Sequence, residues 1–446
     1  MNKSHVIENG LGSIIVGKYG GTSNANPDRV RTIADITLSN PSRRVITVSA
    51  PGNGDSNDPL QNFRVTQALR KGKFDLVWQR FDRMASDLFG HDERYDRIKR
   101  EIDQTQRKAA FTGISPYSES RGEDIQGKIV SELIGATYLD PSQLIFLNSN
   151  GTIHPKTYER IRRVVKPGKR YVLGGYFGTN IDTGEIQLLP PGGTDLTGAI
   201  ASKALNAVVY ENFTDVNGVL SADPRIVFNP KGVEVLTSDE MGEMGHRGAG
   251  ILQVDAVEPL RGTGTPINIK NSFNPGHPGT LVVDQRVSPP GEYIIGIASR
   301  EGFVSFEVEE PGMARNPGAL AKITNIFANE GVSLEQGPGG RNHVSFITHS
   351  DQFTNGQDQQ VMRRIRSEVK PTRLTRVDNL GLVAIVGQRL EHDATHINAI
   401  MYPALSKANI RTGAHIQSTS PNSVVFSVDN CDVNKTVNVL YESLIL

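Results

Sequence analysis

The feature that most constrains this chain is a regular alternation of short apolar runs with helical stretches, in which glycines follow the runs. Ser13 to Lys18 and Arg44 to Ser49 have the length and apolar content of buried strands, and Gly20 and Gly52 follow them. The stretch Asp28 to Leu38 between them has a helical pattern. Strands that alternate with helices predict a largely parallel sheet covered by helices on both faces.

The same alternation continues to about residue 270. Further β-like runs are Gln143 to Leu147, Arg170 to Leu173, Ala207 to Phe213 and Thr265 to Ile269, and helical stretches are Ile125 to Leu139 and Thr197 to Leu205. In parallel sheets of this kind, ligands bind beyond the carboxyl ends of the strands. The turns that follow the strands are therefore where we expect functional residues.

Composition excludes several classes of protein. The 446 residues include 48 basic and 48 acidic side chains, and this balance argues against nucleic acid or an anionic membrane surface as partner. Cys431 is the single cysteine, so no disulfide can form within the chain and we expect a reducing, cytoplasmic compartment. The sequence has no secretory signal pattern, and no apolar run approaches the roughly 20 residues that cross a bilayer.

The alternating pattern of strands and helices ends near residue 291, and an internal repeat follows. Two stretches, 303–369 and 382–442, each have the order β-α-β-β-α, with a terminal strand plausible in both, as in small ferredoxin-like units. We therefore expect domains at 1–291, 292–377 and 378–446. The repeated units are either packing modules or ligand sensors, and we favour sensors because such pairs commonly follow an enzymatic domain.

The segment Lys18 to Ser23 combines a lysine with two glycines at a strand end. Glycines let the backbone approach a phosphate, successive N–H groups bind anions, and a lysine supplies a mobile charge for a phosphoryl group. The segment is not a Walker loop, because the lysine precedes the glycines. A tight strand-to-helix turn explains the pattern equally well.

Two acidic residues accompany other helix starts. Asp195 lies in the segment Gly192 to Thr197, where it acts either as a helix cap or at an anion site near the helix N-terminus. Glu123 follows Ser120, Arg121 and Gly122, and it either receives a substrate ammonium group or favours the first turn of its helix.

A third polar segment, Phe213 to Val219, is followed closely by Ala222 to Arg225, and together they suit a ribose and phosphates or form a surface loop. The ten histidines lack a metal-binding spacing, so we expect no protein metal cluster and only the Mg²⁺ that accompanies a nucleotide. The sequence lacks the G-x-S-x-G motif of α/β-hydrolases. It also lacks the G-x-G-x-x-G motif of dinucleotide-binding folds after the first strand.

Taken in order, these motifs resemble the aspartate kinase family. The segments that carry the resemblance are KYGGTS (18–23), SAPG (49–52), SRGE (120–123), GGTDLTGAI (192–200), TDVNGV (214–219), ADPRIV (222–227) and NSFNPGHPGTL (271–281). The resemblance implies a three-layer α/β/α sandwich of the amino-acid-kinase fold, followed by two ferredoxin-like ACT units. It also implies transfer of the γ-phosphoryl group of ATP to the side-chain carboxylate of L-aspartate, giving 4-phospho-L-aspartate on the way to lysine, threonine and methionine.

The resemblance further implies roles for individual residues. The implied catalytic residues are Lys18 and Asp195. Those implied at the nucleotide are Lys18, Tyr19, Gly20, Gly21, Thr214, Asp215, Asp223 and Arg225, and those implied at the amino acid are Ser49, Thr66, Glu123 and Asp195. From the resemblance we also expect ATP with Mg²⁺ as cofactors, an amino-acid effector at the ACT units, and a homodimer.

One departure from the family concerns the acceptor. Most members have Arg-Gly-Gly-Ser-Asp where this chain has Pro191 to Asp195, so the arginine expected to clamp a substrate carboxylate is missing. Such a contact contributes about 1.5–3 kcal/mol, and its loss predicts roughly ten- to hundredfold weaker capture of aspartate unless another cation substitutes. By sequence the nearest candidate is Arg121, which is equally well a solvated arginine.

Three hypotheses remain open at this point: an aspartate kinase with compensated contacts, a kinase of the same mechanism for another carboxylate-bearing amino acid, and a catalytically weak amino-acid-binding regulator. The joint presence of Lys18, Glu123 and Asp195 argues against the regulator.

Overall fold

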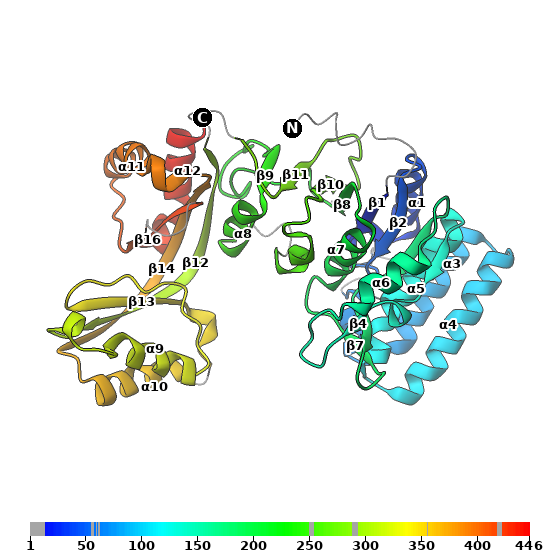
Figure 1. Cartoon of the computed structure of the whole chain (residues 1–446), viewed down its shortest axis with the longest axis horizontal. Helices are drawn as coiled ribbons and strands as arrows, with labels where there is room; N and C mark the ends of the chain where they lie inside the picture. The colour runs from blue at the N-terminus through cyan, green and yellow to red at the C-terminus, as the bar shows by residue number, and fades with distance from the viewer. Residues whose placement is uncertain are drawn as a thin grey trace. The chain divides into compact units, whose positions relative to one another are not determined.

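The computed structural model describes residues 14–54, 58, 60, 63–248, 254–287, 293–354, 356–416 and 422–446 (Figure 1). The chain forms two compact units. The first comprises Met1–Val219, Gly232–Ser238 and Ile251–Arg286, and the second comprises Leu220–Lys231, Asp239–Gly250 and Val287–Leu446. Within the described ranges, no helix combines the length and the apolar character needed to traverse a lipid bilayer.

An eight-stranded sheet organises the first unit, in the order β3-β5-β2-β1-β8-β10-β11-β9. Every neighbouring pair is parallel except β10 and β11, so the predicted, largely parallel sheet is confirmed. Its strands are β1 (Ile15–Tyr19), β2 (Arg43–Val48), β3 (Thr137–Leu139), β5 (Tyr171–Gly174), β8 (Val209–Thr214), β9 (Val235–Thr237), β10 (Ile267–Asn271) and β11 (Thr280–Val283). The run predicted at 143–147 instead contributes β4 (Phe146–Leu147) to a small sheet with β6 (Phe177–Asn180) and β7 (Ile186–Leu188).

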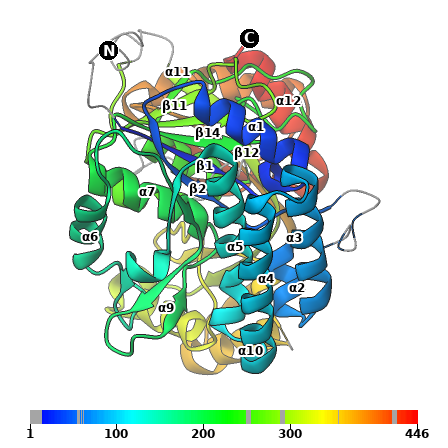
Figure 2. The same ribbon diagram turned by 90° about the vertical axis from the view of Figure 1, so that its right-hand side faces the viewer.

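Helices cover both faces of this sheet, and Figure 2 shows α1 and α7 on either side of β1 and β2. One layer consists of α1 (Pro27–Leu38), α2 (Val65–Arg70), α3 (Phe74–Phe89), α4 (Glu93–Thr112) and α5 (Pro116–Ile134). The other contains α7 (Gly193–Leu205), against which α6 (Lys156–Val164) packs.

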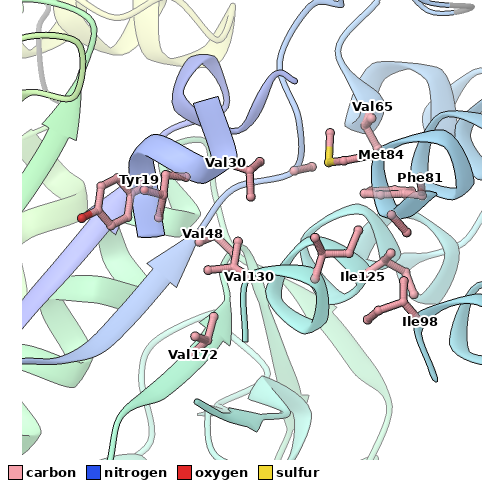
Figure 3. Packing of buried hydrophobic residues seen from close by; sticks show 14 of the residues in the cluster. Tyr19, Val30, Val48, Val65, Phe81, Met84, Ile98, Ile125, Val130 and Val172 are labelled. Atoms are coloured by element: carbon pink, nitrogen blue, oxygen red, sulfur yellow. The ribbon is translucent and has the colours of Figure 1, made fainter. Parts of the chain in front are cut away.

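The main core of the first unit lies between the sheet and the α1–α5 layer (Figure 3). Strand side chains alternate between the two faces, so Tyr19 and Val48 enter this core together with Val130 of α5 and Phe81 of α3. Lys18, the neighbour of Tyr19, consequently points to the opposite face, where α7 lies. This alternation gives one face of β1 a packing role and leaves the other for chemistry.

The second unit contains a five-stranded antiparallel sheet, in the order β13-β12-β14-β16-β15. The strands are β12 (Ile294–Glu309), β13 (His343–His349), β14 (Arg373–Gly387), β15 (His415–Ile416) and β16 (Ser423–Asp429). Figure 1 shows the long strands β12 and β14 joining two helix pairs, α9 (Ala319–Asn329) with α10 (Gln357–Arg364) and α11 (Leu390–Lys407) with α12 (Val433–Leu444). Each pair covers its own apolar core, and α8 (Ser238–His246) lies mostly in this unit.

The two repeat copies share strands. Their predicted first strands, 303–308 and 382–387, are the second halves of β12 and β14. The first half of β12, Ile294 to Arg300, pairs with Leu382 to Gly387, so a segment that precedes the first copy completes the sheet of the second. Residue 377 lies inside β14, whereas the boundary predicted at 291 lies outside the described residues. The division into three domains stays a prediction.

Candidate active site

A cavity of about 740 Å³ lies at the carboxyl ends of the parallel strands, where this kind of sheet favours ligand binding. Its walls come from the turns after β1, β2, β5 and β8 and from the ends or faces of α2, α5 and α7. The predicted site residues that line it are Lys18, Gly21, Ser49, Thr66, Glu123, Asp195 and Asp215. Residues from seven separate stretches of the chain therefore meet in one place.

Lys18 and Asp195 form an ion pair inside this cavity, with 2.7 Å between the lysine Nζ and the Asp195 Oδ1. Asn212 of β8 joins them, because its Oδ1 accepts from Lys18 Nζ at 3.3 Å and its Nδ2 donates to Asp195 Oδ1 at 2.9 Å. Helix α7 begins at Gly193 after Gly192, whose φ of 80° suits glycine, and no side chain caps it. The capping interpretation of Asp195 is therefore wrong, and its carboxylate is free to orient the lysine.

The glycines after β1 and β2 are needed where two turns touch. The Gly52 N–H donates to the Gly21 carbonyl at 2.8 Å, and a Cβ on Gly52 would lie 2.9 Å from that carbonyl. Tyr19 is fully buried and stacks on Phe213 with 4.8 Å between ring centroids, so only its backbone is available to a nucleotide. These contacts bring the first turn and the Ser49–Gly52 turn together.

Glu123 is a buried carboxylate, and no cationic side chain in the described part of the chain forms an ion pair with it. It lies in the second turn of α5, since this helix begins at Pro116 after the capping residue Ser115, and the first-turn alternative is wrong. Its side chain is 4% exposed, its Oε1 accepts from Thr66 Oγ1 at 3.3 Å, and its Oε2 has no hydrogen-bond partner. Burial raises its pKa to about 7, so a ligand that brings an ammonium group would favour the ionised form.

Arg121 does not replace the missing arginine. Two residues of helix separate it from Glu123, which places the two side chains on different faces of α5. Its guanidinium instead pairs with Asp124 at 3.0 Å and lies over the rings of Tyr117 and Phe177. Arg121 is buried, so the solvated alternative is also wrong.

Other contacts connect the remaining walls of the cavity. Ser49 Oγ donates to Thr194 Oγ1 at 2.9 Å, which joins the turn after β2 to the start of α7. Pro191 is exposed and lines the cavity, so the residue at the departure from the family lies where it affects ligands.

The predicted nucleotide residues divide between the two units. Thr214 ends β8, and its hydroxyl donates to the carboxylate of Asp215 at 3.2 Å. Asp223 and Arg225 belong to the second unit, where they form an ion pair with each other at 2.6 Å. Their roles toward a nucleotide stay predictions.

Three lining or supporting residues gave no signal in the sequence. Asn212 lies within an ordinary strand, and Arg70 and Tyr176 line the cavity without belonging to a recognisable motif. Their place at the site becomes visible only in the folded chain, where segments that are distant in the sequence lie close together.

The comparisons with known proteins agree with this geometry. Residues 13–271 match the amino acid kinase family. Aspartokinase 3 of Bacillus subtilis is 28% identical over 95% of this chain and 97% of its own length. The aspartate kinase of Clostridium acetobutylicum is 30% identical, with a TM-score of 0.86 over 97% of this chain and all of that one. A structure of Escherichia coli aspartokinase III in complex with aspartate and ADP shares the fold, with a TM-score of 0.73 at 22% identity over 97% of this chain and all of that one.

The family match covers the whole eight-stranded sheet except β11, and the Clostridium enzyme matches both units. The chain therefore belongs to the amino acid kinase family and, within it, to the aspartate kinases.

Proposed function

We propose that this chain transfers the γ-phosphoryl group of ATP to the side-chain carboxylate of L-aspartate, releasing ADP and 4-phospho-L-aspartate. The observation that carries the proposal is the joint presence, in one cavity, of the Lys18–Asp195 pair and the unpaired carboxylate of Glu123. The first suits a phosphoryl group and the second an amino group. Membership of the aspartate kinases supports the same reaction.

For this phosphoryl transfer the protein has to position the two substrates and stabilise the negative charge on the transferring group. A carboxylate oxygen of the acceptor attacks the γ-phosphorus, the bond from that phosphorus to the β,γ-bridging oxygen breaks, and ADP leaves with the electron pair. Because the acceptor is already ionised, no general base is needed. Lys18 stabilises the negative charge on the transferring oxygens, and Asp195 and Asn212 hold its ammonium group in place.

The nucleotide is assigned to the backbone of Tyr19, Gly20 and Gly21 and to the end of β8, at Thr214 and Asp215. Asp223 and Arg225 belong to the second unit, and only the resemblance supports their assignment to the nucleotide. Mg²⁺ binds mainly to phosphates and water and needs only one or two protein carboxylates, and Asp215 and Asp195 at the cavity wall would hold it there. When bound, the metal supplies charge that neutralises the phosphates.

At the amino acid, Glu123 receives the ammonium group. Thr66 and Ser49 donate their hydroxyl protons to Glu123 and Thr194, so their oxygens are left to accept hydrogen bonds from the substrate. The position of Pro191 in the cavity wall favours one second candidate, a kinase of the same mechanism for a different carboxylate-bearing amino acid. Replacing Pro191 by arginine separates the two. It lowers the KM for aspartate if affinity alone was lost, and it impairs the native acceptor if the pocket serves another acid.

An ADP-release assay across aspartate, glutamate and N-acetylglutamate tests the proposed function. We expect ADP release with aspartate well above the rate of ATP hydrolysis alone. Preferential turnover of another acid would establish the second candidate, and no acceptor-dependent ADP release would contradict both.

For the second unit we propose two ACT domains, 292–377 and 378–446, that follow a catalytic domain at 1–291 and bind an amino-acid effector. A cavity of about 310 Å³ lies on the five-stranded sheet and adjoins the turn at 331–341, where we expect the effector to bind. Pro338, Gly339 and His343 line it together with Ser305, whose buried hydroxyl has no hydrogen-bond partner among the described residues. Calorimetric titration of the whole chain with lysine, threonine and methionine tests this assignment, and heat from none of them would favour packing modules.

The proposal also includes a homodimer and a reducing cytoplasm, where ATP and aspartate are available. Sedimentation at several protein concentrations tests the dimer, with a single species of one-chain mass as the contrary result.

A further inference from the structure

We infer that Arg70 is the residue that binds the α-carboxylate of the amino-acid acceptor, in place of the arginine that this chain lacks at position 191. This inference rests on the proposed function, and it concerns which residue determines the affinity for the acceptor. Arg70 is the last residue of α2 and lines the cavity with Thr66 and Glu123.

Among the described residues, four cationic side chains line the cavity and could bind the α-carboxylate. They are Lys18, Arg29, Arg64 and Arg70. Lys18 is already assigned to the transferring phosphoryl group, and Arg29 donates to the Thr22 carbonyl at 2.7 Å and lies over the ring of Phe273. Arg29 is therefore held at the turn after β1, on the side proposed for the nucleotide. The remaining candidates are Arg64, the capping residue before α2, and Arg70, the last residue of α2.

Arg70 is held in position, as a binding residue must be. Its Nε donates to Glu119 Oε2 at 2.7 Å and its Nη2 donates to the hydroxyl of Tyr176. An arginine has five N–H donors, so the pair on Nη1 stays available for a carboxylate. Arg64 and Arg70 are both exposed, but Arg64 forms no ion pair in the described structure, which makes it the less ordered candidate.

Tyr176 connects Arg70 with the turn that contains Pro191. A Cβ on Gly193 would lie 3.0 Å from both the Cα and the Cδ2 of Tyr176, so this tyrosine packs directly on the 191–193 turn. The Tyr176 φ of 76° is unusual for a bulky residue, and such strain concentrates at ligand sites. Arg70 thus lies one tyrosine away from the position where the family has its arginine.

The distribution of charge around Tyr176 fits the two ends of an amino acid. Burial raises the pKa of the Tyr176 hydroxyl, Arg70 lowers it, and the carboxylates of Glu119 and Glu123 raise it. Arg70 and Glu123 are both near enough to this hydroxyl to influence it. An α-amino acid carries its ammonium and carboxylate groups on one carbon, so Glu123 takes the first and Arg70 the second. The side-chain carboxylate then remains for phosphorylation beside Lys18.

The test compares aspartate with β-alanine, which keeps the ammonium group and the accepting carboxylate but lacks the α-carboxylate. In the wild-type enzyme, kcat/KM should be about 10- to 100-fold higher for aspartate than for β-alanine. Arg70→Ala should raise the KM for aspartate by the same factor, leave β-alanine unaffected and so abolish the discrimination. Arg64→Ala, at the residue that precedes the same helix, is the matched comparison.

A second substitution makes the test independent of folding effects. Adding Pro191→Arg to Arg70→Ala should restore at least tenfold of the lost affinity for aspartate, which a misfolded protein would not regain. Arg70→Gln, which keeps hydrogen-bonding capacity without charge, should behave like Arg70→Ala.

Unchanged aspartate KM in both Arg70 variants, or a loss confined to Arg64→Ala, would overturn the inference while leaving the proposed function intact. A wild-type enzyme that phosphorylates neither acid would overturn the proposed function and this inference with it.

Discussion

The two largest sheets described in this molecule differ in the polar side chains that they bury. The eight-stranded sheet buries charged side chains, among them Lys18, Arg43 and Glu211, whereas the buried polar side chains of the five-stranded sheet are the neutral Ser305 and a few similar residues. The other neutral ones are Thr348, Ser423 and Ser427. Burying an ion costs several kcal/mol unless it is paired, so buried charges persist only where they are matched or used.

Within the first sheet, the two faces use their charges differently. Arg43 and Glu211 pair through two hydrogen bonds of 2.6 and 3.0 Å, and the arginine also donates to a carbonyl of α1. Neither residue lines the cavity. Lys18 and Asp195 pair on the α7 face, inside the cavity. One pair therefore lies in the protein interior away from the cavity, while the other lies where we propose that phosphoryl transfer takes place.

The largest effect that the comparison predicts is on stability. Glu211→Ala leaves the Arg43 guanidinium buried without its partner and should lower the free energy of unfolding by about 3–5 kcal/mol. Urea denaturation of both proteins measures the difference. A loss below about 1 kcal/mol would mean that this pair contributes no more than a surface ion pair.

Lys18→Ala should instead lower kcat by a factor on the order of 10²–10³, the usual loss for one electrostatic contact in a water-poor site, while the fold is kept. Steady-state kinetics with saturating ATP and aspartate measures it. Lys203→Ala is the control, because Lys203 is an exposed lysine of α7 away from the cavity. Near-normal turnover of Lys18→Ala would remove this lysine from the mechanism.

Glu123 links charge burial to pH. Its raised pKa of about 7 predicts that kcat/KM for aspartate rises with pH and levels off above 7, since only the carboxylate attracts the ammonium group. Glu123→Gln should lower kcat/KM and remove this rise. A wild-type profile that is flat between pH 5.5 and 8 would contradict the assignment.

The same residue affects stability in the opposite direction. Because the folded state holds the Glu123 proton more tightly than the unfolded chain, the contribution of this group to stability falls as pH rises from about 4.5 to 7. The full difference is on the order of 3 kcal/mol. Denaturation at pH 5 and pH 8 should show a smaller pH effect in Glu123→Gln than in the wild type.

The smallest effect is expected in the five-stranded sheet. The Ser305 hydroxyl is buried without a partner, so Ser305→Ala removes an unsatisfied group and should change the free energy of unfolding by less than about 1 kcal/mol, in the stabilising direction. Urea denaturation measures this change as well. Destabilisation by 2 kcal/mol or more would show that a neutral buried group matters here as much as a charge.

Sequence reasoning reached the parallel sheet because strand and helix periodicities are local properties, and it reached Lys18, Glu123 and Asp195 through motifs at strand ends and helix starts. It did not predict that the first half of β12, Ile294 to Arg300, pairs with the second repeat. That pairing joins residues some 90 positions apart, which local periodicity does not reveal. It also missed Arg70 and Tyr176, whose roles follow from a positive φ and from contacts between distant segments. Asn212 was not predicted as a site residue, because only its contacts with Lys18 and Asp195 in the folded chain place it beside the cavity.

The central claim is that the cavity phosphorylates the side-chain carboxylate of aspartate. An acyl phosphate reacts with hydroxylamine, so turnover with ATP, aspartate and hydroxylamine should yield the side-chain hydroxamate of aspartate, quantified by mass spectrometry. We predict one hydroxamate for each ADP released by the wild-type enzyme, and at least a hundredfold slower formation with Lys18→Ala. ADP release by the wild type without any hydroxamate would contradict the account.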